Sequence, residues 1–283
     1  MSQEKTNNFL KVDYHIHTTL CNHAGKSMEA YIRKAVSTGF KEICFLDHLT
    51  LTEPGHMFSM TPEEVPLYFN AVQILKWRYI GVINIKAGLE IDFNPSYVDL
   101  VRKISESYAF DVIGSSLHFP GGIDVVSRKS EWSRGEKDSD YIYALYLEFL
   151  DKMLDYSYFD VVCHLDLVKK FGGNPSRSFE NEFDCIIDRI GRKKLTVEVN
   201  TSGYIHPAKE AYPSFDIIKK CCNSGVEITI GSDAHEPESI GQYYDTVLPL
   251  ILKAGYKQIS VFTKRKRSGI PIPAGSGNDM PKG

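Results

Sequence analysis

The stretch KVDYHIHTTLCNH, residues 11–23, begins as an apolar run and ends in three closely spaced histidines. His15 and His17 are separated by a single residue, and His23 follows in the next segment. A polar strand end with solvent-facing histidines would explain this pattern. A metal site would explain it as well, because the neutral imidazole is a common metal ligand. The rest of the chain must decide between the two interpretations.

Short β-rich runs alternate with helical segments along the whole chain. The β-rich runs occur at 11–16, 42–47, 83–91, 111–117, 159–164, 195–200 and 227–232, with a weaker eighth at 257–262. Helical spacing occurs between them at 28–38, 62–79, 95–107, 139–155, 179–192, 213–224 and 242–254. Apolar runs of this kind are typical of parallel strands with both faces covered. The pattern predicts an α/β fold of repeated βα units, either closed into a barrel or left as a doubly wound open sheet.

The composition predicts a sizeable core and a surface of mixed charge. Of the 283 residues, 42% are hydrophobic and the net charge is -3, so nucleic acid is not an expected partner. No leader-like segment and no apolar stretch of about 18 residues is present, and the six cysteines form no C-x-x-C pair, so we expect a cytoplasmic protein that does not span a membrane. We expect one domain over 1–272, a solvated KRKR run at 264–267 and a poorly ordered tail over 273–283.

Seven of the nine histidines end or follow predicted strands. They are His15, His17, His23, His48, His118, His164 and His235. Glu90 and Asp92 end the third run, and Asp233 follows the seventh. In a β/α barrel these positions share one rim. So many imidazoles would repel one another if protonated and lack partners if neutral, whereas divalent ions bind their lone pairs. We therefore expect two or three divalent ions, with Glu90 as a bridging carboxylate.

Six motifs in order resemble the signature motifs of the PHP (polymerase and histidinol phosphatase) metallohydrolase superfamily. They are DYHIHTTLCNH, LDH, GLEID, SLHF, CHLDL and GSDAH, and the resemblance runs from about residue 12 to residue 262. Within the superfamily, EVNTSGYIHPAKEAYPS at 198–214 is similar to a segment of the histidinol-phosphate phosphatases. The resemblance implies a distorted (β/α)7 TIM-like barrel with its metal site at the C-terminal ends of the strands.

The resemblance also implies three groups of metal ligands. The first ion would be bound by His15, His17, Glu90 and Asp233. The second would share Glu90 and add His118 and His164. The third would be bound by His23, His48 and His235. Sites built from histidine and carboxylate accept several metals, so zinc, manganese and iron all remain candidates.

The activity implied by the resemblance is hydrolysis of L-histidinol phosphate to L-histidinol and phosphate, a step of histidine biosynthesis. A metal-bridging hydroxide would attack phosphorus, and Asp233 or His235 would protonate the leaving alkoxide. Phosphate also needs groups that bind it beyond the metals. The candidates are Lys169, Lys170, Arg128 and His206, the last at a position where these phosphatases often carry a cation.

Two other functions fit the same residues. A general PHP-type phosphoesterase or phosphodiesterase would act on another small phosphorylated metabolite or a nucleotide. A metal-binding accessory protein would use the ions structurally, although structural sites are usually closed and use few ligands. The two enzyme functions imply a small phosphorylated metabolite as partner, whereas the accessory protein does not. The sequence does not define the oligomeric state.

Overall fold

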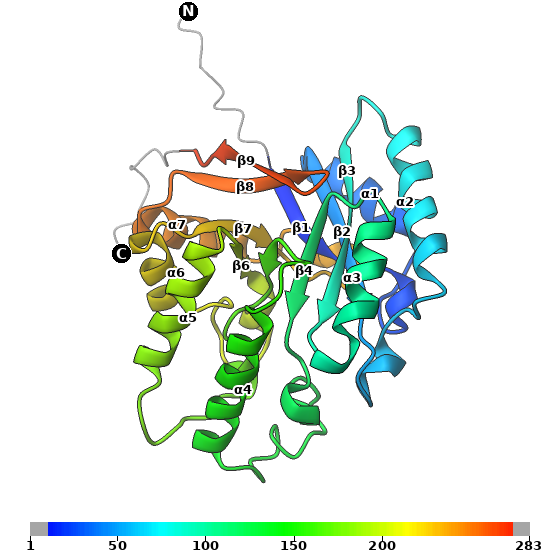
Figure 1. Ribbon diagram of the computed structural model, residues 1–283. Helices are drawn as coiled ribbons and strands as arrows, with labels where there is room; N and C mark the ends of the chain where they lie inside the picture. The colour runs from blue at the N-terminus through cyan, green and yellow to red at the C-terminus, as the bar shows by residue number, and fades with distance from the viewer. Residues whose placement is uncertain (1–10, 274–283) are drawn as a thin grey trace, which may run out of the picture.

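The computed structural model describes residues 11–273, whose core is a ring of seven parallel strands (Figure 1). The strands, each hydrogen-bonded to the next in chain order, are β1 (Val12–Ile16), β2 (Glu42–Leu49), β3 (Asn84–Asp92), β4 (Val112–Ser116), β5 (Val161–Val162), β6 (Thr196–Asn200) and β7 (Glu227–Gly231). The ring closes just beyond β7. There the Ala234 N–H donates to the His15 carbonyl at 3.1 Å, and the His17 N–H donates to the Ala234 carbonyl at 3.0 Å. The fold is therefore a (β/α)7 barrel, and the open-sheet alternative is wrong.

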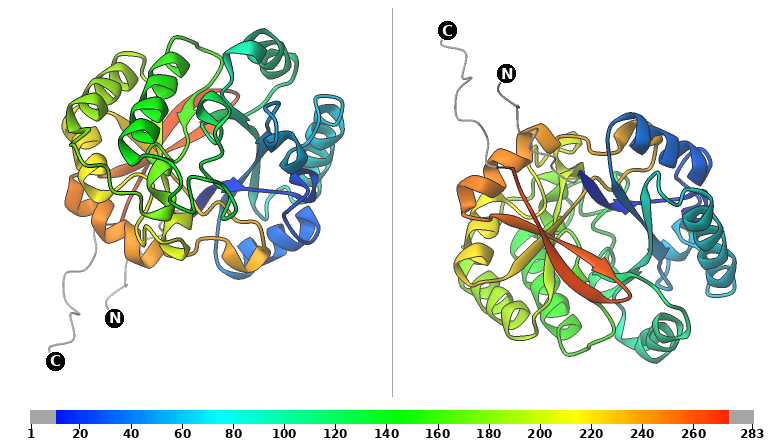
Figure 2. Two further views of the ribbon diagram at one scale, coloured as in Figure 1. Left: turned by 90° about the horizontal axis from the view of Figure 1, so that it is seen from below. Right: turned by 90° about the horizontal axis from the view of Figure 1, so that it is seen from above.

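Seven helices surround the strands as an outer layer (Figure 2). They are α1 (Met28–Ser37), α2 (Val65–Arg78), α3 (Val98–Ser107), α4 (Ser139–Met153), α5 (Glu180–Arg192), α6 (Phe215–Asn223) and α7 (Tyr244–Ala254). Several begin at the side-chain caps that the sequence favours. Ser27 caps α1, Asp138 caps α4 and Ser214 caps α6, each by accepting a backbone N–H of the first turn.

Each barrel strand is followed by a short 3-10 turn before its helix begins. The turns are η1 (Thr19–Cys21), η2 (Gly55–Phe58), η3 (Pro95–Tyr97), η4 (Pro120–Gly122), η5 (Leu167–Phe171), η6 (Thr201–Ile205) and η7 (Pro237–Ser239). All of them lie on the C-terminal side of the strands. Hydrogen-bonded turns hold the loops of this rim, so the side chains at the strand ends have fixed neighbours.

The eighth β-rich run does not enter the barrel. It forms β8 (Gln258–Thr263), which pairs antiparallel with β9 (Lys266–Pro271) in a separate two-stranded sheet. This hairpin crosses the N-terminal end of the barrel (Figure 2, right). Arg265 in its turn donates to Asp160 and to the Tyr158 carbonyl, so the KRKR run is not simply a solvated stretch. The prediction of an eighth strand was correct, but this strand lies across the N-terminal end of the barrel, which we call the barrel floor, and not in the ring.

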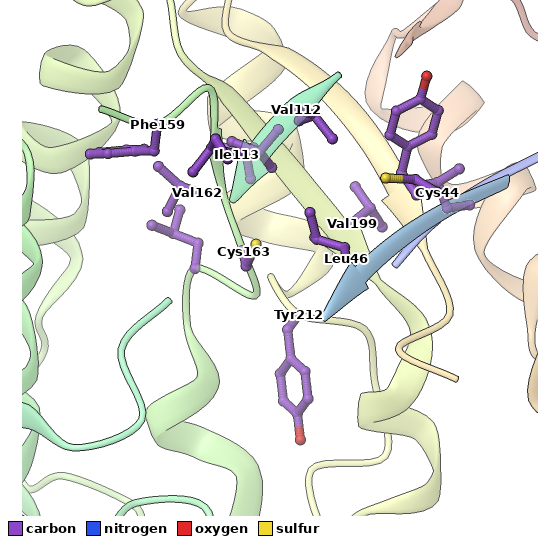
Figure 3. Packing of buried hydrophobic residues seen from close by; sticks show 14 of the residues in the cluster. Cys44, Leu46, Val112, Ile113, Phe159, Val162, Cys163, Val199 and Tyr212 are labelled. Atoms are coloured by element: carbon purple, nitrogen blue, oxygen red, sulfur yellow. The ribbon is translucent and has the colours of Figure 1, made fainter. Parts of the chain in front are cut away.

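The interior of the barrel is packed so closely that two strand positions require glycine. A Cβ on Gly114 would lie 2.5 Å from the Cys163 Sγ, and one on Gly88 would lie 2.6 Å from a methyl group of Leu46. Figure 3 shows Leu46 and Cys163 close together among these residues. Because side chains alternate along a strand, Glu90 faces the same way as Gly88, two residues nearer the C-terminal rim. The apolar packing thus ends where the polar rim begins.

All six cysteines are free thiols. Within 11–273, none of the helices is both long enough and apolar enough to cross a membrane. The predicted tail lies, apart from Pro273, outside the described residues. The single domain over 1–272 also remains a prediction for its first ten residues, which are not described.

Candidate metal centre

The nine residues predicted to bind metal come together at the C-terminal rim. Burial decreases outward from the centre of this group. His15, His17 and Glu90 are completely buried, whereas His48 and His235 are partly buried and His23 is exposed. A centre whose inner residues are buried and whose outer residues are exposed can receive a ligand from solvent.

Glu90 lies in the middle of the histidines. Its carboxylate oxygens are 2.7 Å from His164 Nε2, 2.8 Å from His48 Nδ1, 3.2 Å from His15 Nε2 and 3.6 Å from His118 Nε2. Burial disfavours its charged form, but the surrounding imidazoles hold the pKa of Glu90 well below its usual range. An ionised carboxylate with histidines on both oxygens has the geometry of a bridging ligand.

Asp233 lies beside Glu90 in a left-handed backbone conformation, with φ of 55°. One of its carboxylate oxygens is 2.9 Å from His17 Nε2, and the other accepts hydrogen bonds from Ser202 and Asn200. Burial opposes ionisation, but the charges of His15 and His17 hold the pKa of Asp233 well below its usual range. Asp233 is therefore ionised at neutral pH, which suits a metal ligand or a proton acceptor better than a proton donor.

Hydrogen bonds on the outer side of the rings fix how the first two histidines are protonated. His15 Nδ1 is 2.6 Å from a Glu198 oxygen, and His17 Nδ1 is 3.3 Å from an Asp47 oxygen. A carboxylate can only accept, so Nδ1 carries hydrogen in both rings and Nε2 points inward. This is how histidines are usually oriented when Nε2 binds a metal and the other nitrogen donates to a carboxylate.

The same arrangement holds at the outer part of the centre. His23 Nδ1 is 2.7 Å from the Cys21 carbonyl, and His235 Nδ1 is 3.0 Å from the Asp233 carbonyl. Both rings must donate from Nδ1, which leaves the lone pair on Nε2. In His235 that Nε2 is buried and has no hydrogen-bond partner among the described residues. A buried lone pair without a partner is the feature that a bound cation would satisfy.

The imidazoles are packed too tightly for all of them to be protonated. The ring centroids of His17 and His235 are 4.1 Å apart, and those of His17 and His48 are 4.2 Å apart. Burial lowers the pKa of His48 to about 3 and that of His235 well below its usual range. His17 differs, because its contacts with Asp233 and Asp47 outweigh burial and raise its pKa to about 9. The cluster thus combines the neutral imidazoles of His48 and His235 with a protonated His17 and ionised carboxylates, and a divalent cation would take the place of the His17 proton.

Close ligand atoms also define possible groups. Among the sets whose ligand atoms lie within 4.8 Å of one another are His15, His17 and Asp233; His17, His48 and His235; and Cys21, His23 and His235. The first set agrees with part of the predicted first site. Cys21 is a buried neighbour of the outer histidines that the sequence pattern did not single out.

A second layer of buried carboxylates supports the histidines from behind, and Glu198 is its main member. One Glu198 oxygen accepts from His15, and the other accepts the His164 backbone N–H at 3.0 Å. His164 has a left-handed backbone, with φ of 29°, which this contact stabilises. A Cβ on Gly231 would lie 2.4 Å from Glu198, so the glycine makes room for the carboxylate. Sequence reasoning missed Glu198, although its place in β6 faces it into the barrel.

Asp47 and Asp92 support the centre in the same way. Asp47 accepts the His48 backbone N–H at 2.9 Å, and Asp92 accepts that of His118 at 2.6 Å. Asp92 also lies 3.2 Å from His118 Nδ1. Asp47 thereby helps to orient both His48 and the ring of His17. Asp92 is buried behind His118, so its contacts are those of a support for the centre.

A cavity of about 490 Å³ opens over the centre. Its lining includes the apolar residues Pro54, Phe58, Phe119, Val126 and Ile205. It also includes Asp233, His235, Lys170 and His206. A lining with both apolar and charged groups suits a small ligand that has one charged end and one less polar end.

The four residues predicted to bind phosphate are placed differently. Lys170 and His206 line the cavity. Lys169 does not line it, and its ammonium group contacts Asp166 at 2.9 Å and Glu210 at 2.8 Å. Arg128 is exposed and also lies outside the cavity lining. Lys170 is therefore the lysine that the structure brings to the centre.

Lys170 has no acidic partner close to it. Among residues 11–273, no carboxylate oxygen lies within 4.0 Å of its ammonium group, although Lys169 next to it has two such partners. Burial lowers the pKa of Lys170, and the more distant charges of Asp233 and Asp124 work against this shift. A lysine in a cavity wall without a counter-ion is suited to bind an anion.

The fold and the site together define a β/α-barrel protein with a histidine-carboxylate centre suited to divalent cations. The PHP domain matches residues 13–202. The chain therefore belongs to the PHP domain family. The match ends before Asp233 and His235, which follow the seventh strand and complete the rim.

The chain is also similar to curated proteins over most of its length. It is 29% identical over 258 residues to the "Probable histidinol-phosphatase" of Deinococcus radiodurans, with 90% of this chain and 97% of that protein covered. It is 26% identical over 265 residues to the histidinol-phosphatase of Lactococcus lactis subsp. lactis, with 90% and 96% covered.

Among solved structures, the chain resembles histidinol phosphate phosphatase from Lactococcus lactis subsp. lactis, crystallised in complex with zinc, L-histidinol and phosphate. The TM-score is 0.80 at 24% identity, with 92% of this chain and 99% of that chain covered. This likeness confirms the predicted barrel fold.

Proposed function

We propose that this chain is a metal-dependent phosphomonoesterase that hydrolyses L-histidinol phosphate to L-histidinol and phosphate in histidine biosynthesis. The observation that carries the proposal is the cavity lined both by the histidine-carboxylate centre and by Lys170, a lysine with no carboxylate partner within residues 11–273. Relatives named histidinol-phosphatase, similar over 90% of this chain, support the choice of substrate. A cytoplasmic location is part of the same proposal.

The proposed ligands are those that resemblance assigned and that the fold brings together. His15, His17, Glu90 and Asp233 form the innermost group, and His23, His48, His118, His164 and His235 complete the set. Bound divalent ions, two or three of zinc, manganese or iron, supply activation of water near neutral pH and neutralisation of phosphate oxygens. The complex of the Lactococcus protein with zinc supports zinc as the first metal to test.

The chain's own groups bind and orient the phosphate ester. Lys170 provides a positive charge opposite the centre. His206 is not a second cation, because burial lowers its pKa to about 4 and leaves it neutral at pH 7. Its buried Nδ1 has no hydrogen-bond partner among the described residues, so His206 acts as a neutral hydrogen-bonding group toward the phosphate. Lys169 and Arg128 lie outside the cavity lining and act on the phosphate only at longer range.

Proton transfer is assigned to Asp233 and His235. Both line the cavity, and His235 Nδ1 lies 3.6 Å from an Asp233 carboxylate oxygen. The ionised Asp233 is suited to accept a proton from the attacking water. The apolar residues of the cavity lining, Phe58 and Phe119 among them, exclude water from the alcohol part of the substrate.

The test is phosphate release from L-histidinol phosphate by zinc- or manganese-loaded protein. The comparison substrates are p-nitrophenyl phosphate and bis-p-nitrophenyl phosphate. We expect a strong preference for histidinol phosphate. His17→Ala should abolish the activity, and His56→Ala should keep it, because the His56 side chain lies outside the centre and the cavity lining. Equal or faster cleavage of the generic esters would instead favour a general phosphoesterase. Failure to cleave any of the three with metal bound would refute the enzyme assignment.

A further inference from the structure

Helix α2 is apolar on two opposite faces. Its inner face packs Val65, Tyr68, Val72 and Leu75 toward the barrel. Its outer face carries Leu67, Ile74 and Trp77, each more than half exposed, and Ile80 follows just beyond the helix. Helices on the surface of a globular protein normally present polar residues to solvent, and a helix that is apolar all round is usually covered on both sides.

Trp77 is the most exposed of these side chains, at 77%. The other tryptophan of the chain, Trp132, is 3% exposed and donates its ring N–H to the Val168 carbonyl. Tryptophan is enriched at the centres of protein interfaces because it buries a large area with little loss of side-chain entropy. Figures 1 and 2 show α2 at the outer edge of the helical layer, with no described element outside it.

The outer face has the spacing of a helix-helix seam. Leu67, Asn70, Ile74 and Trp77 follow one another at intervals of three, four and three residues. This is the a/d spacing of a heptad repeat, the pattern by which one helix packs along another. We call these four residues the outer stripe of α2. Asn70 is the one polar position in it.

Charges at the ends of the stripe define the direction of the partner helix. Glu63 and Glu64 precede the helix, and Arg78 ends it. The Arg78 guanidinium lies 3.6 Å from Glu29 of the same chain but is more than half exposed, and its five N–H donors leave room for a second carboxylate. A parallel copy would place like charges together. An antiparallel copy places Glu63 and Glu64 of each chain beside Arg78 of the other, and the two helix dipoles then also oppose each other.

We propose that the outer stripe of α2 is the interface of a homodimer, in which α2 packs antiparallel to α2 of a second copy about a two-fold axis. In this arrangement Trp77 of one chain meets Leu67 of the other, and Ile74 meets Asn70. Each contact occurs twice, as an isologous interface requires. The active-site rim need not take part, so the dimer is independent of the proposed function.

The test is the mass of the full chain in solution, measured by sedimentation equilibrium. At about 10 µM chain we expect twice the chain mass of 32.0 kDa. Trp77→Glu and Ile74→Glu should each raise the dimer dissociation constant on the order of 100-fold, because they place a charge in the seam. Tyr141→Glu is the matched control, since Tyr141 is equally an exposed aromatic residue on another helix, α4, and its substitution should leave the mass unchanged.

Charge reversal tests the antiparallel direction. Arg78→Glu should weaken the dimer, because it faces Glu63 and Glu64 of the second copy, and adding Glu64→Arg to the same chain should restore it. A wild-type protein that sediments at the chain mass would overturn the proposal. A dimer insensitive to both Trp77→Glu and Ile74→Glu would overturn it too, because the interface would then lie elsewhere. Circular dichroism of each variant must match the wild type, so that a lost dimer does not reflect an unfolded helix.

Discussion

Removing the Glu198 carboxylate should disable the metal centre without touching any proposed ligand. Glu198 accepts the Nδ1–H of His15 at 2.6 Å and the backbone N–H of His164 at 3.0 Å. In Glu198→Ala both donors lose their acceptor inside the protein, and the His15 ring is free to rotate or change its tautomer. The two histidines belong to different proposed ion sites, so one substitution should weaken both.

The size of the effect follows from those two contacts. Hydrogen bonds to a charged acceptor contribute about 1.5–3 kcal/mol each, so the loss of both in Glu198→Ala should lower the free energy of unfolding by about 3–6 kcal/mol. Loss of a carboxylate behind a metal ligand typically costs about 10–100-fold in metal affinity. Glu198→Gln keeps an acceptor for His15 but places an amide near the His164 N–H. We expect an intermediate loss of affinity and a smaller loss of stability.

The assay is zinc affinity by chelator competition, combined with metal content by mass spectrometry and unfolding by urea. Glu42→Gln is the matched control. Glu42 is a buried carboxylate at the opposite end of the barrel, where it accepts from Tyr14 at 2.5 Å and lies 3.5 Å from Lys86. Glu42→Gln should lower the free energy of unfolding but leave the zinc affinity unchanged. Wild-type zinc affinity in Glu198→Ala, or an equal loss in Glu42→Gln, would refute the reasoning.

Three further outcomes are expected. Lys170→Ala should lower kcat/KM for the phosphate ester about 100-fold through the lost charge-assisted contact, and Lys170→Arg should restore it. Because burial lowers the pKa of Lys170, this lysine should lose its charge at alkaline pH, and the KM of the wild type should then rise. The KM of Lys170→Arg should stay constant over the same pH range. Parallel pH profiles of the two proteins would contradict this explanation. The pKa of His17 is raised to about 9, so it holds a proton at neutral pH that a metal must displace. Zinc affinity should therefore rise about tenfold per pH unit from pH 6 to 8, and a pH-independent affinity would argue against this protonation state. A chelator should abolish activity but leave the far-ultraviolet circular dichroism spectrum unchanged, since the hydrogen bonds of the strand ring and of the β8–β9 hairpin do not involve the ions. An unfolded apoprotein would indicate a structural role for the ions.

The sequence pattern predicted the order of elements well because each βα unit is encoded locally. All seven barrel strands and all seven helices lie where apolar runs and helical spacing indicate them. The helix expected from residue 62 begins at Val65, because the segment before it forms a turn in which Glu64 accepts the Thr61 N–H. Closure of the ring was beyond local pattern, since it rests on hydrogen bonds between His15 and Ala234, distant in sequence.

The candidate ligands could be predicted because histidine is rare and each one follows a strand. The groups behind them could not be found in this way. Glu198 and Asp13 are ordinary carboxylates in sequence, and only the fold shows that Asp13 accepts the backbone N–H groups of Ser232 and Gly241. Lys169 and Lys170 are neighbours with equal claims in sequence. Their different surroundings, an ion pair for one and the cavity wall for the other, depend on Glu210 from a distant loop.

The hairpin across the barrel floor has a consequence for how the protein is made. Phe262 in β8 donates its backbone N–H to the Tyr14 hydroxyl in β1 at 2.7 Å, which joins the two ends of the described chain. The proposed metal centre likewise needs His17, just after the first strand, and Asp233, just after the last strand of the barrel. A chain still emerging from the ribosome therefore lacks both the hairpin and Asp233, one of the four innermost ligands, until its C-terminal segment is released. Metal uptake should be the last event of maturation, and a shortened chain should leave the ribosome without its metal.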